Sequence, residues 1–177
     1  GKTEMWYTLE AEKDSRIFTG FREPISKETY AGALDAGSLA ELLNVENPEP
    51  GDVFFTPAGR IHAIGSGIIL AEIQQTSDIT YRIYDWNRKD ASGSGRELHT
   101  DLALDAIDFN ASGINRKKIL PMLNKTENLT NCEFFTTNMI NFNELIIKDY
   151  NLIDSFVIYI CTEGEFLIRW EGNSEPV

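Results

Sequence analysis

The residues whose types and spacing are best suited to chemistry lie between positions 51 and 62. Gly51, Pro57 and Gly59 precede His62. Gly51 permits a sharp turn into a strand, and Pro57 with Gly59 predicts a tight corner, after which the next strand directs His62 into a β structure. An imidazole in that position is a common metal ligand. A histidine seen alone is more often a core or surface residue, but this glycine–proline frame favours the metal ligand.

The frame resembles the second motif of the cupin superfamily, in which Gly, Pro, Gly and His have the same spacing. The superfamily motif ends in Asn where this chain has Ser66, a departure that we expect to affect the turn more than a metal site. Other cupin chemistries, such as oxygenases and epimerases, usually require two or three histidines on the earlier motif. This chain has only two histidines in total and none there.

Three further stretches resemble the class I mannose-6-phosphate isomerases, especially their short bacterial form. They are Gly-Lys-Thr-Glu-Met-Trp-Tyr at residues 1–7, Glu-Ile-Gln-Gln-Thr-Ser-Asp-Ile-Thr-Tyr-Arg-Ile-Tyr-Asp at residues 72–85, and Arg-Glu-Leu-His at residues 96–99. The resemblance runs from Gly1 to Phe109 and continues more weakly through the later strands, which are similar to the family's C-terminal β domain.

The resemblance implies Zn²⁺ as the cofactor, with Glu4 and His62 as two of its ligands. It also implies that Arg82 is the catalytic residue and that Lys2 and Asp78 line the substrate pocket. The family's remaining ligands come from a Gln-x-His segment upstream of the opening strand, and this sequence does not contain that segment.

Residue types alone leave alternatives for these side chains. Glu4 also fits a carboxylate at a strand edge, and Arg82 also fits a surface ion pair with Asp78 or Asp85. His99 is more typical of a helix cap or packing contact than of catalysis. The basic run at residues 116–118 is typical of a solvated face, with phosphate contact as a second interpretation.

The implied chemistry suits these residue types. Isomerisation of an aldose to a ketose moves a proton between adjacent carbons through an enediol. Zinc held by His and carboxylate polarises the carbonyl and hydroxyl oxygens as a Lewis acid. Arg82 is a poor base and is expected to stabilise an enediolate or hold a phosphate. Lys2 becomes the base only if burial lowers its pKa, so the proton-transferring group stays open.

Charge and composition restrict the partners. The 177 residues include 28 acidic and 16 basic side chains, a formal net charge of -12, which repels nucleic acid and anionic membranes. The substrate is therefore expected to be a small hexose phosphate held by a local basic cluster. Cys132 and Cys161 have no metal-type spacing and are expected to be buried reduced thiols, which favours a cytoplasmic protein.

The fold class expected is mostly β, a cupin jelly roll with a small helical insertion and part of a second β domain. Short apolar strands separated by Gly and Pro are typical of antiparallel sandwiches. The expected domains are an incomplete cupin domain at residues 1–88 with the insertion at 26–43, a helical linker at 89–125, and the start of a C-terminal β domain at 126–177. Strands are expected at residues 4–11, 60–63 and 80–84, and in the second half at 134–139, 142–148, 156–161 and 166–170. Ser26 is expected to cap a helix that runs to about Ala36, followed by a short helix at 39–43 and a further helix at 97–109. Trp6 is assigned to the core and barrel rim.

Together these features predict a zinc-dependent isomerase of mannose 6-phosphate and fructose 6-phosphate, present as a fragment that is inactive alone. The alternative is a non-catalytic sugar-phosphate-binding or regulatory cupin that has kept the fold without the metal. Sugar selectivity and oligomeric state do not follow from these residues.

Overall fold

The computed structural model describes residues 1–77, 79–85, 89 and 91–177. Asp78, predicted to line the substrate pocket, therefore lies outside the described residues. The chain divides into two compact units, residues 1–141 and residues 142–177. The boundaries expected near residues 88 and 125 stay predictions.

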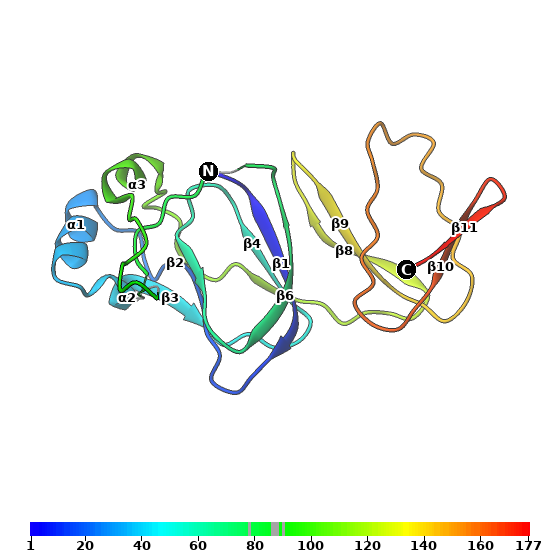
Figure 1. Ribbon diagram of the computed structural model, residues 1–177, viewed down its shortest axis with the longest axis horizontal. Coiled ribbons are helices and arrows are strands. Elements are labelled where there is room, and N and C mark those ends of the chain that lie inside the picture. Colours follow the sequence, from blue (N-terminus) through cyan, green and yellow to red (C-terminus); the bar gives the residue numbers. More distant parts are fainter. Residues whose placement is uncertain (78, 86–88, 90) are drawn as a thin grey trace. The chain divides into compact units, whose positions relative to one another are not determined.

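The first unit is built around two antiparallel sheets (Figure 1). The larger has the strand order β6-β1-β4-β7, with bounds Ile68–Gln74, Glu4–Ala11, Asp52–Thr56 and Arg116–Lys118. The smaller has the order β3-β2-β5, with bounds Leu43–Glu46, Ile17–Phe21 and His62–Ile64. A hairpin of β8 (Lys125–Asn131) and β9 (Thr136–Asn141) completes the strands of this unit.

Strand β1 is buried on both faces over its first half, which explains the consecutive apolar residues Met5, Trp6 and Tyr7. On one face Trp6 packs with Phe54 and with Ile17 of the smaller sheet, so this cluster joins the two sheets. On the other face Met5 and Val53 pack with residues of the β8–β9 hairpin. Alternation along a strand sends successive side chains to opposite faces, so Glu4 shares the face of Trp6.

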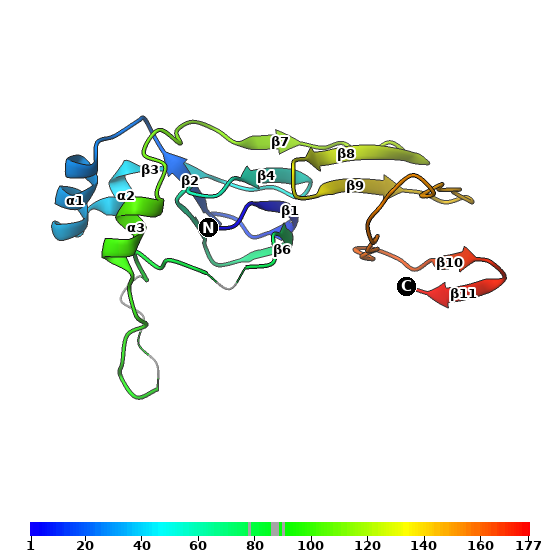
Figure 2. The same cartoon turned by 90° about the horizontal axis from the view of Figure 1, so that it is seen from above.

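Three helices lie at one end of the first unit (Figure 2). Their bounds are Lys27–Asp35 for α1, Leu39–Leu42 for α2 and Thr100–Ala106 for α3. The side chain of Ser26 caps α1 by accepting a hydrogen bond from the Thr29 amide at 3.1 Å, as its sequence predicts. Tyr30 of α1 and Leu39 of α2 bury against Phe21 of β2.

The second unit contains one regular hairpin, formed by β10 (Leu167–Trp170) and β11 (Asn173–Pro176). Several of its apolar side chains are exposed, among them Leu145, Leu152 and Phe156. The strands expected at residues 142–148 and 156–161 are absent from this part of the structure. Their β propensity finds no ladder partner here, and propensity alone does not hold a strand.

Other local predictions were also wrong. The strand expected at residues 80–84 is irregular, and the helix expected at 97–109 is limited to Thr100–Ala106. Leu43, expected to end a helix, instead begins β3 because it pairs with Phe21. Cys132 and Cys161 are unpaired as expected, but both are only half-buried. No helix among the described residues is long and apolar enough to cross a membrane.

Candidate functional site

The corner before β5 has the backbone that its glycines and proline predict. Gly51 and Gly59 have φ values of 88° and 89°, in the region that favours glycine. A Cβ on Gly59 would also lie 3.0 Å from the carbonyl oxygen of Ala106. The Arg60 amide donates to the Pro57 carbonyl at 3.1 Å and closes the turn. The chain therefore enters β5 with His62 as its first residue.

The pairing of β2 with β5 decides which way His62 points. Ile17 lies opposite Ile64, and Thr19 lies opposite His62. Ile64 packs against the cluster containing Trp6 and Ile17, between the sheets. Since residues two apart on a strand share a face, His62 faces the same interior as Ile64.

Glu4 and His62 meet across this interior, one from each sheet. His62 Nε2 lies 3.7 Å from Glu4 Oε2. The Glu4 residue is 2 % exposed, whereas the side chain of His62 is 33 % exposed. The carboxylate thus lies at the bottom of the site, and the imidazole lies nearer to solvent.

Lys2 and Trp6 hold the two oxygens of the Glu4 carboxylate. Lys2 Nζ lies 3.4 Å from Oε1, and the indole Nε1–H of Trp6 donates to Oε2 at 3.1 Å. Lys2 also donates a hydrogen bond to the side-chain oxygen of Gln74, which pairs with Glu4 in the ladder between β1 and β6. A carboxylate this deeply buried requires such partners, because burying an unpaired charge is costly.

The other ring nitrogen of His62 is fixed by the backbone. Nδ1 lies 2.8 Å from the carbonyl oxygen of Arg60. A carbonyl only accepts, so we assign the proton to Nδ1, which leaves the lone pair of the neutral ring on Nε2. Nε2 is the nitrogen that faces Glu4.

Glu72 belongs to the same electrostatic environment. It pairs with Trp6 in the ladder between β1 and β6. Partial burial raises the pKa of Glu72, and the negative charge of Glu4 raises it further, while Lys2 and His62 act in the opposite direction. A carboxyl group with a raised pKa beside a buried carboxylate is a candidate for proton transfer.

The structure does not join Arg82 to this group: among the described residues, no hydrogen bond or ion pair links it to Glu4, His62 or Lys2. Instead its backbone is paired with His99. The Arg82 amide donates to His99 Nδ1 at 3.2 Å, and the His99 amide donates to the Arg82 carbonyl at 2.7 Å. The role of Arg82 in catalysis stays a prediction.

Asp85, considered above as a partner for Arg82, is bound by Arg96. Arg96 Nε donates to Asp85 Oδ2 at 2.8 Å, and a second guanidinium nitrogen contacts Oδ1. This bidentate pair links Asp85 to Arg96, just as the backbone contacts link Arg82 to His99.

The basic run at 116–118 has a structural role, since Arg116 and Lys118 contact the buried Asp52 at 2.9 and 3.7 Å.

The pair formed by Glu4 and His62 fits a divalent metal in donor chemistry and spacing. Zinc takes nitrogen and oxygen ligands at about 2.0–2.2 Å, which places two donors of a tetrahedral site about 3.3 Å apart. The observed 3.7 Å between Nε2 and Oε2 is close to that spacing. Within the described ranges, no group of three or more His, Cys, Asp or Glu residues is arranged to hold a metal ion. The described part of the chain therefore offers two candidate ligands of the three or more that metal sites use.

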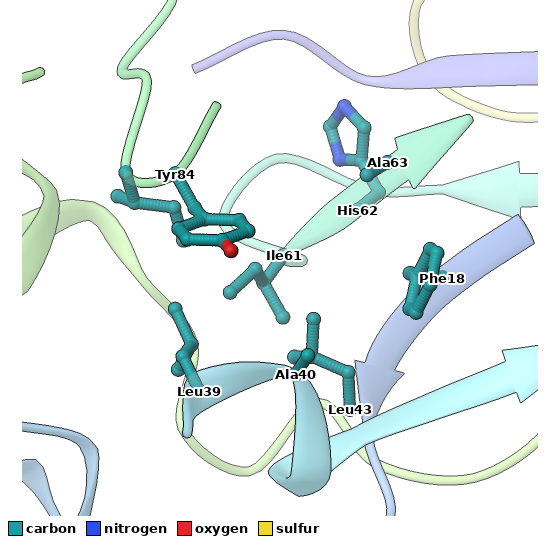
Figure 3. A pocket seen from close by; sticks show the side chains of 9 residues that line it. Phe18, Leu39, Ala40, Leu43, Ile61, His62, Ala63 and Tyr84 are labelled. Atoms are coloured by element: carbon teal, nitrogen blue, oxygen red, sulfur yellow. The ribbon is translucent and has the colours of Figure 1, made fainter. Parts of the chain in front are cut away.

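A small apolar pocket of about 50 Å³ lies beside His62 (Figure 3). Its lining comes from β2, α2, the start of β3, β5 with the preceding Ile61, and the segment after β6. In Figure 3 the imidazole points away from Leu39, Ala40 and Leu43. The pocket therefore lies on the side of β5 away from the His62 ring nitrogens, and it is not the site where those nitrogens would bind a ligand.

Comparison with known proteins agrees with this geometry. No family model matches the chain. The chain is 38 % identical over 145 residues to mannose-6-phosphate isomerase ManA of Bacillus subtilis, covering 80 % of this chain and 45 % of that protein. It is 43 % identical over 107 residues to mannose-6-phosphate isomerase of Streptococcus mutans, covering 60 % of this chain and 34 % of that protein. The chain is homologous to the mannose-6-phosphate isomerases.

A solved structure supports the same family. The chain matches the crystal structure of mannose 6-phosphate isomerase from Bacillus subtilis with a TM-score of 0.62 and 31 % identity, over 78 % of this chain and 44 % of that one. The resemblance to mannose-6-phosphate isomerases and the mostly-β, cupin-type fold are thereby confirmed. The chain spans 34 % and 45 % of the length of these two curated relatives.

Sequence reasoning missed two residues of the site in this mannose-6-phosphate isomerase homologue. Trp6 was assigned to the core and barrel rim and given no role in the site, although it is two residues from Glu4 and shares its face. Glu72 was quoted only as part of a motif. Strand alternation places Glu72 and Gln74 on one face, and pairing with β1 places that face beside Glu4. The signal was present, but the register between β1 and β6 was needed to use it.

Proposed function

We propose that this chain carries part of the active site of a zinc-dependent aldose–ketose isomerase that interconverts mannose 6-phosphate and fructose 6-phosphate. The observation that supports it best is the approach of Glu4 Oε2 and His62 Nε2 to 3.7 Å, from two sheets and across 58 positions of sequence. An isolated carboxylate at a strand edge, the alternative interpretation of Glu4, does not explain a residue that is 2 % exposed and faces an imidazole.

Glu4 and His62 would hold the metal. When bound there, zinc would act as a Lewis acid on the carbonyl and hydroxyl oxygens of the open-chain sugar. The Nδ1 contact with Arg60 keeps the imidazole oriented with Nε2 toward the cation. Zinc is favoured over magnesium because nitrogen is among the donors, whereas magnesium prefers an all-oxygen set.

Glu72 is the group that we assign to proton transfer. The reaction removes a proton from C2 of the aldose and returns it to C1, while a hydroxyl proton moves from O2 to O1. A base for this step must lie beside the metal ligands, and Glu72 is diagonal to Glu4 on the adjacent strand; in the metal-free chain partial burial and the charge of Glu4 raise its pKa. Lys2, the earlier candidate, is hydrogen-bonded to Gln74 and paired with Glu4, so we assign it to orienting Glu4 and to binding substrate oxygens.

The family resemblance adds two residues to the proposal: Arg82 as the catalytic residue and Asp78 as a residue that lines the substrate pocket. A guanidinium suits a phosphate or an enediolate, and the global charge of -12 makes a local cation necessary for an anionic substrate. The same negative charge disfavours nucleic acid and anionic membranes as partners. We also propose a cytoplasmic location, because both cysteines are unpaired.

The competing function is that of a non-catalytic sugar-phosphate-binding cupin. The two functions differ in whether binding of the sugar phosphate requires zinc. We expect the chain to bind Zn²⁺ weakly by isothermal titration, and mannose 6-phosphate binding to require that zinc. His62→Asn should abolish zinc binding because Asn retains a donor near the Nδ1 position but lacks Nε2. His99→Asn is the matched control and should leave zinc binding unchanged.

Turnover provides the second test. Catalytic zinc sites use three protein ligands, and the described part of this chain supplies two. We therefore expect the 177-residue chain to be inactive alone in a coupled assay with added zinc. Robust turnover would show that two ligands suffice. Sugar-phosphate binding that persists in His62→Asn and in the presence of a chelator would refute the isomerase and support the binding module.

A further inference from the structure

Trp6 lies at the centre of the site without belonging to its predicted ligands. The residue is fully buried, and its ring lies in a T-shaped arrangement with the ring of His62, at a centroid distance of 5.2 Å and an interplanar angle of 71°. Its Nε1–H donates to Glu4 Oε2 at 3.1 Å. One side chain therefore contacts both candidate metal ligands.

We infer that Trp6 is a positioning residue that fixes the Glu4 carboxylate and the His62 ring in the orientation required to share one divalent cation. This inference rests on the proposed function, because it assumes that Glu4 and His62 bind the metal. The decisive detail is which oxygen is held. Trp6 donates to Oε2, and Oε2 is also the oxygen nearest His62 Nε2.

The chemistry of the donor suits this role. An indole N–H donates one hydrogen bond and never accepts or ionises, so it orients an oxygen without competing for the cation. A carboxylate oxygen has two lone pairs, and one remains available after the hydrogen bond from Trp6. Lys2, by comparison, contacts Oε1 with a full positive charge. The two oxygens of Glu4 thus have different partners: charged Lys2 contacts Oε1, and the neutral Trp6 N–H contacts Oε2, the oxygen that faces His62.

The contact is also required by Trp6 itself. A buried indole N–H without an acceptor would cost on the order of 1–3 kcal/mol. Glu4 supplies that acceptor inside the sandwich, and the ring packs with Phe54 and Ile17. The rotamer of Trp6 is therefore fixed by the core, and the rotamer of Glu4 is fixed by Trp6. This arrangement couples packing of the two sheets to the geometry of the site.

The variant Trp6→Phe tests the inference, because it removes the N–H and keeps an aromatic ring. Partners that orient metal ligands typically contribute 10–100-fold to metal affinity. We expect Trp6→Phe to weaken Zn²⁺ binding by about that factor at 25 °C, measured by titration of the folded chain. Tyr30→Phe is the matched control: Tyr30 is equally buried and lies in a different core cluster. It should leave zinc affinity within twofold of the wild type.

A measurement on the wild-type chain covers the case in which Trp6→Phe does not fold. In ¹H–¹⁵N spectra the indole signal of Trp6, assigned by elimination with Trp86→Phe and Trp170→Phe, should shift on addition of Zn²⁺. The signal of Trp170, which lies in the second unit, should not. If the Trp6 signal does not move when the chain is saturated with zinc, the inference about Trp6 is wrong but the proposed metal site stands. The same holds if Trp6→Phe folds and binds zinc with wild-type affinity. A wild-type chain that binds no zinc overturns the proposed metal site and the inference together.

Discussion

Glu72→Gln is expected to make the metal-free first unit more stable at neutral pH, although it changes a residue that we assign to the reaction. The variant keeps the size of the side chain and removes its charge. Its expected effect follows from the pKa of Glu72, which partial burial and the charge of Glu4 raise above the ordinary value of 4.5. A group with a raised pKa binds its proton more tightly in the folded chain than in the unfolded chain.

The sign of the pH dependence follows from that difference. Well below pH 4.5 both states carry the proton and Glu72 makes no difference. As the pH rises above 4.5 the unfolded chain loses the proton first, so the wild type loses stability until Glu72 is ionised in the folded chain as well. Glu72→Gln has no such loss. The two proteins should therefore match at low pH and separate progressively toward neutrality.

The size of the separation comes from the sheet geometry. Glu72 pairs with Trp6, so it is diagonal to Glu4 on the adjacent strand, at about 7–8 Å. Two unit charges at that distance repel by about 0.6 kcal/mol in water and about 2 kcal/mol at an effective dielectric constant of 20. Glu72 is exposed enough to favour the lower half of this range, and Lys2 and His62 offset part of it. We expect a gain of about 0.5–1 kcal/mol at pH 7.5.

Urea unfolding in the presence of a chelator, repeated from pH 4 to pH 8, measures this difference. Glu10→Gln is the matched control, because Glu10 is exposed on the same strand β1 and pairs with Ile69. The control should show no separation that grows with pH. An equal or lower stability of Glu72→Gln at pH 7.5, or a difference independent of pH, would refute the shared electrostatic environment of Glu4 and Glu72.

Substitutions at three further positions, Gly20, Arg60 and Ser26, test contacts that stabilise the first unit. Gly20→Ala should destabilise the first unit by roughly 2–4 kcal/mol in chemical unfolding, because φ is +72° and a Cβ would lie 2.5 Å from the Ala111 carbonyl oxygen; a loss below 1 kcal/mol would contradict this. Arg60→Met should cost about 2–4 kcal/mol by the same measurement, since the buried guanidinium donates to Thr19 Oγ1 at 3.0 Å and to the Gly113 carbonyl at 2.6 Å. Ser26→Ala should cost about 1 kcal/mol through loss of the α1 cap, whereas Ser26→Asp should retain the stability.

The sequence predicted those parts of the fold that depend on local pattern. Glu4–Ala11 was predicted with the correct bounds from its alternation and from Trp6, Tyr7 and Leu9. The cap at Ser26 and the corner at Pro57 and Gly59 also follow from residue type, because each requires a particular side chain or φ angle. These features place His62 in a strand without any knowledge of its partners, although the strand begins at His62 and not at Arg60 as expected.

The missed parts depend on long-range pairing. Arg116–Lys118 is a basic run with no strand pattern, yet it forms β7 because it pairs with β4 and its charges reach Asp52. Conversely, residues 142–148 have strand-like composition and form no strand. The proximity of Glu72 to Glu4 has the same origin. Register between strands some sixty positions apart is not encoded in either strand alone.

Two of the buried carboxylates of the first unit, Asp52 and Glu4, differ in what their partners do. Asp52 accepts from the Glu49 amide at 2.6 Å and binds Arg116, so its contacts join β4 to β7 and account for it structurally. Glu4 is bound by Lys2 and Trp6, from its own end of β1, and by His62 from the other sheet. Well-packed apolar residues often replace buried ion pairs without loss of stability, so packing does not require a carboxylate at Glu4. Its second oxygen is held facing His62 Nε2, which is the arrangement that the proposed shared cation requires.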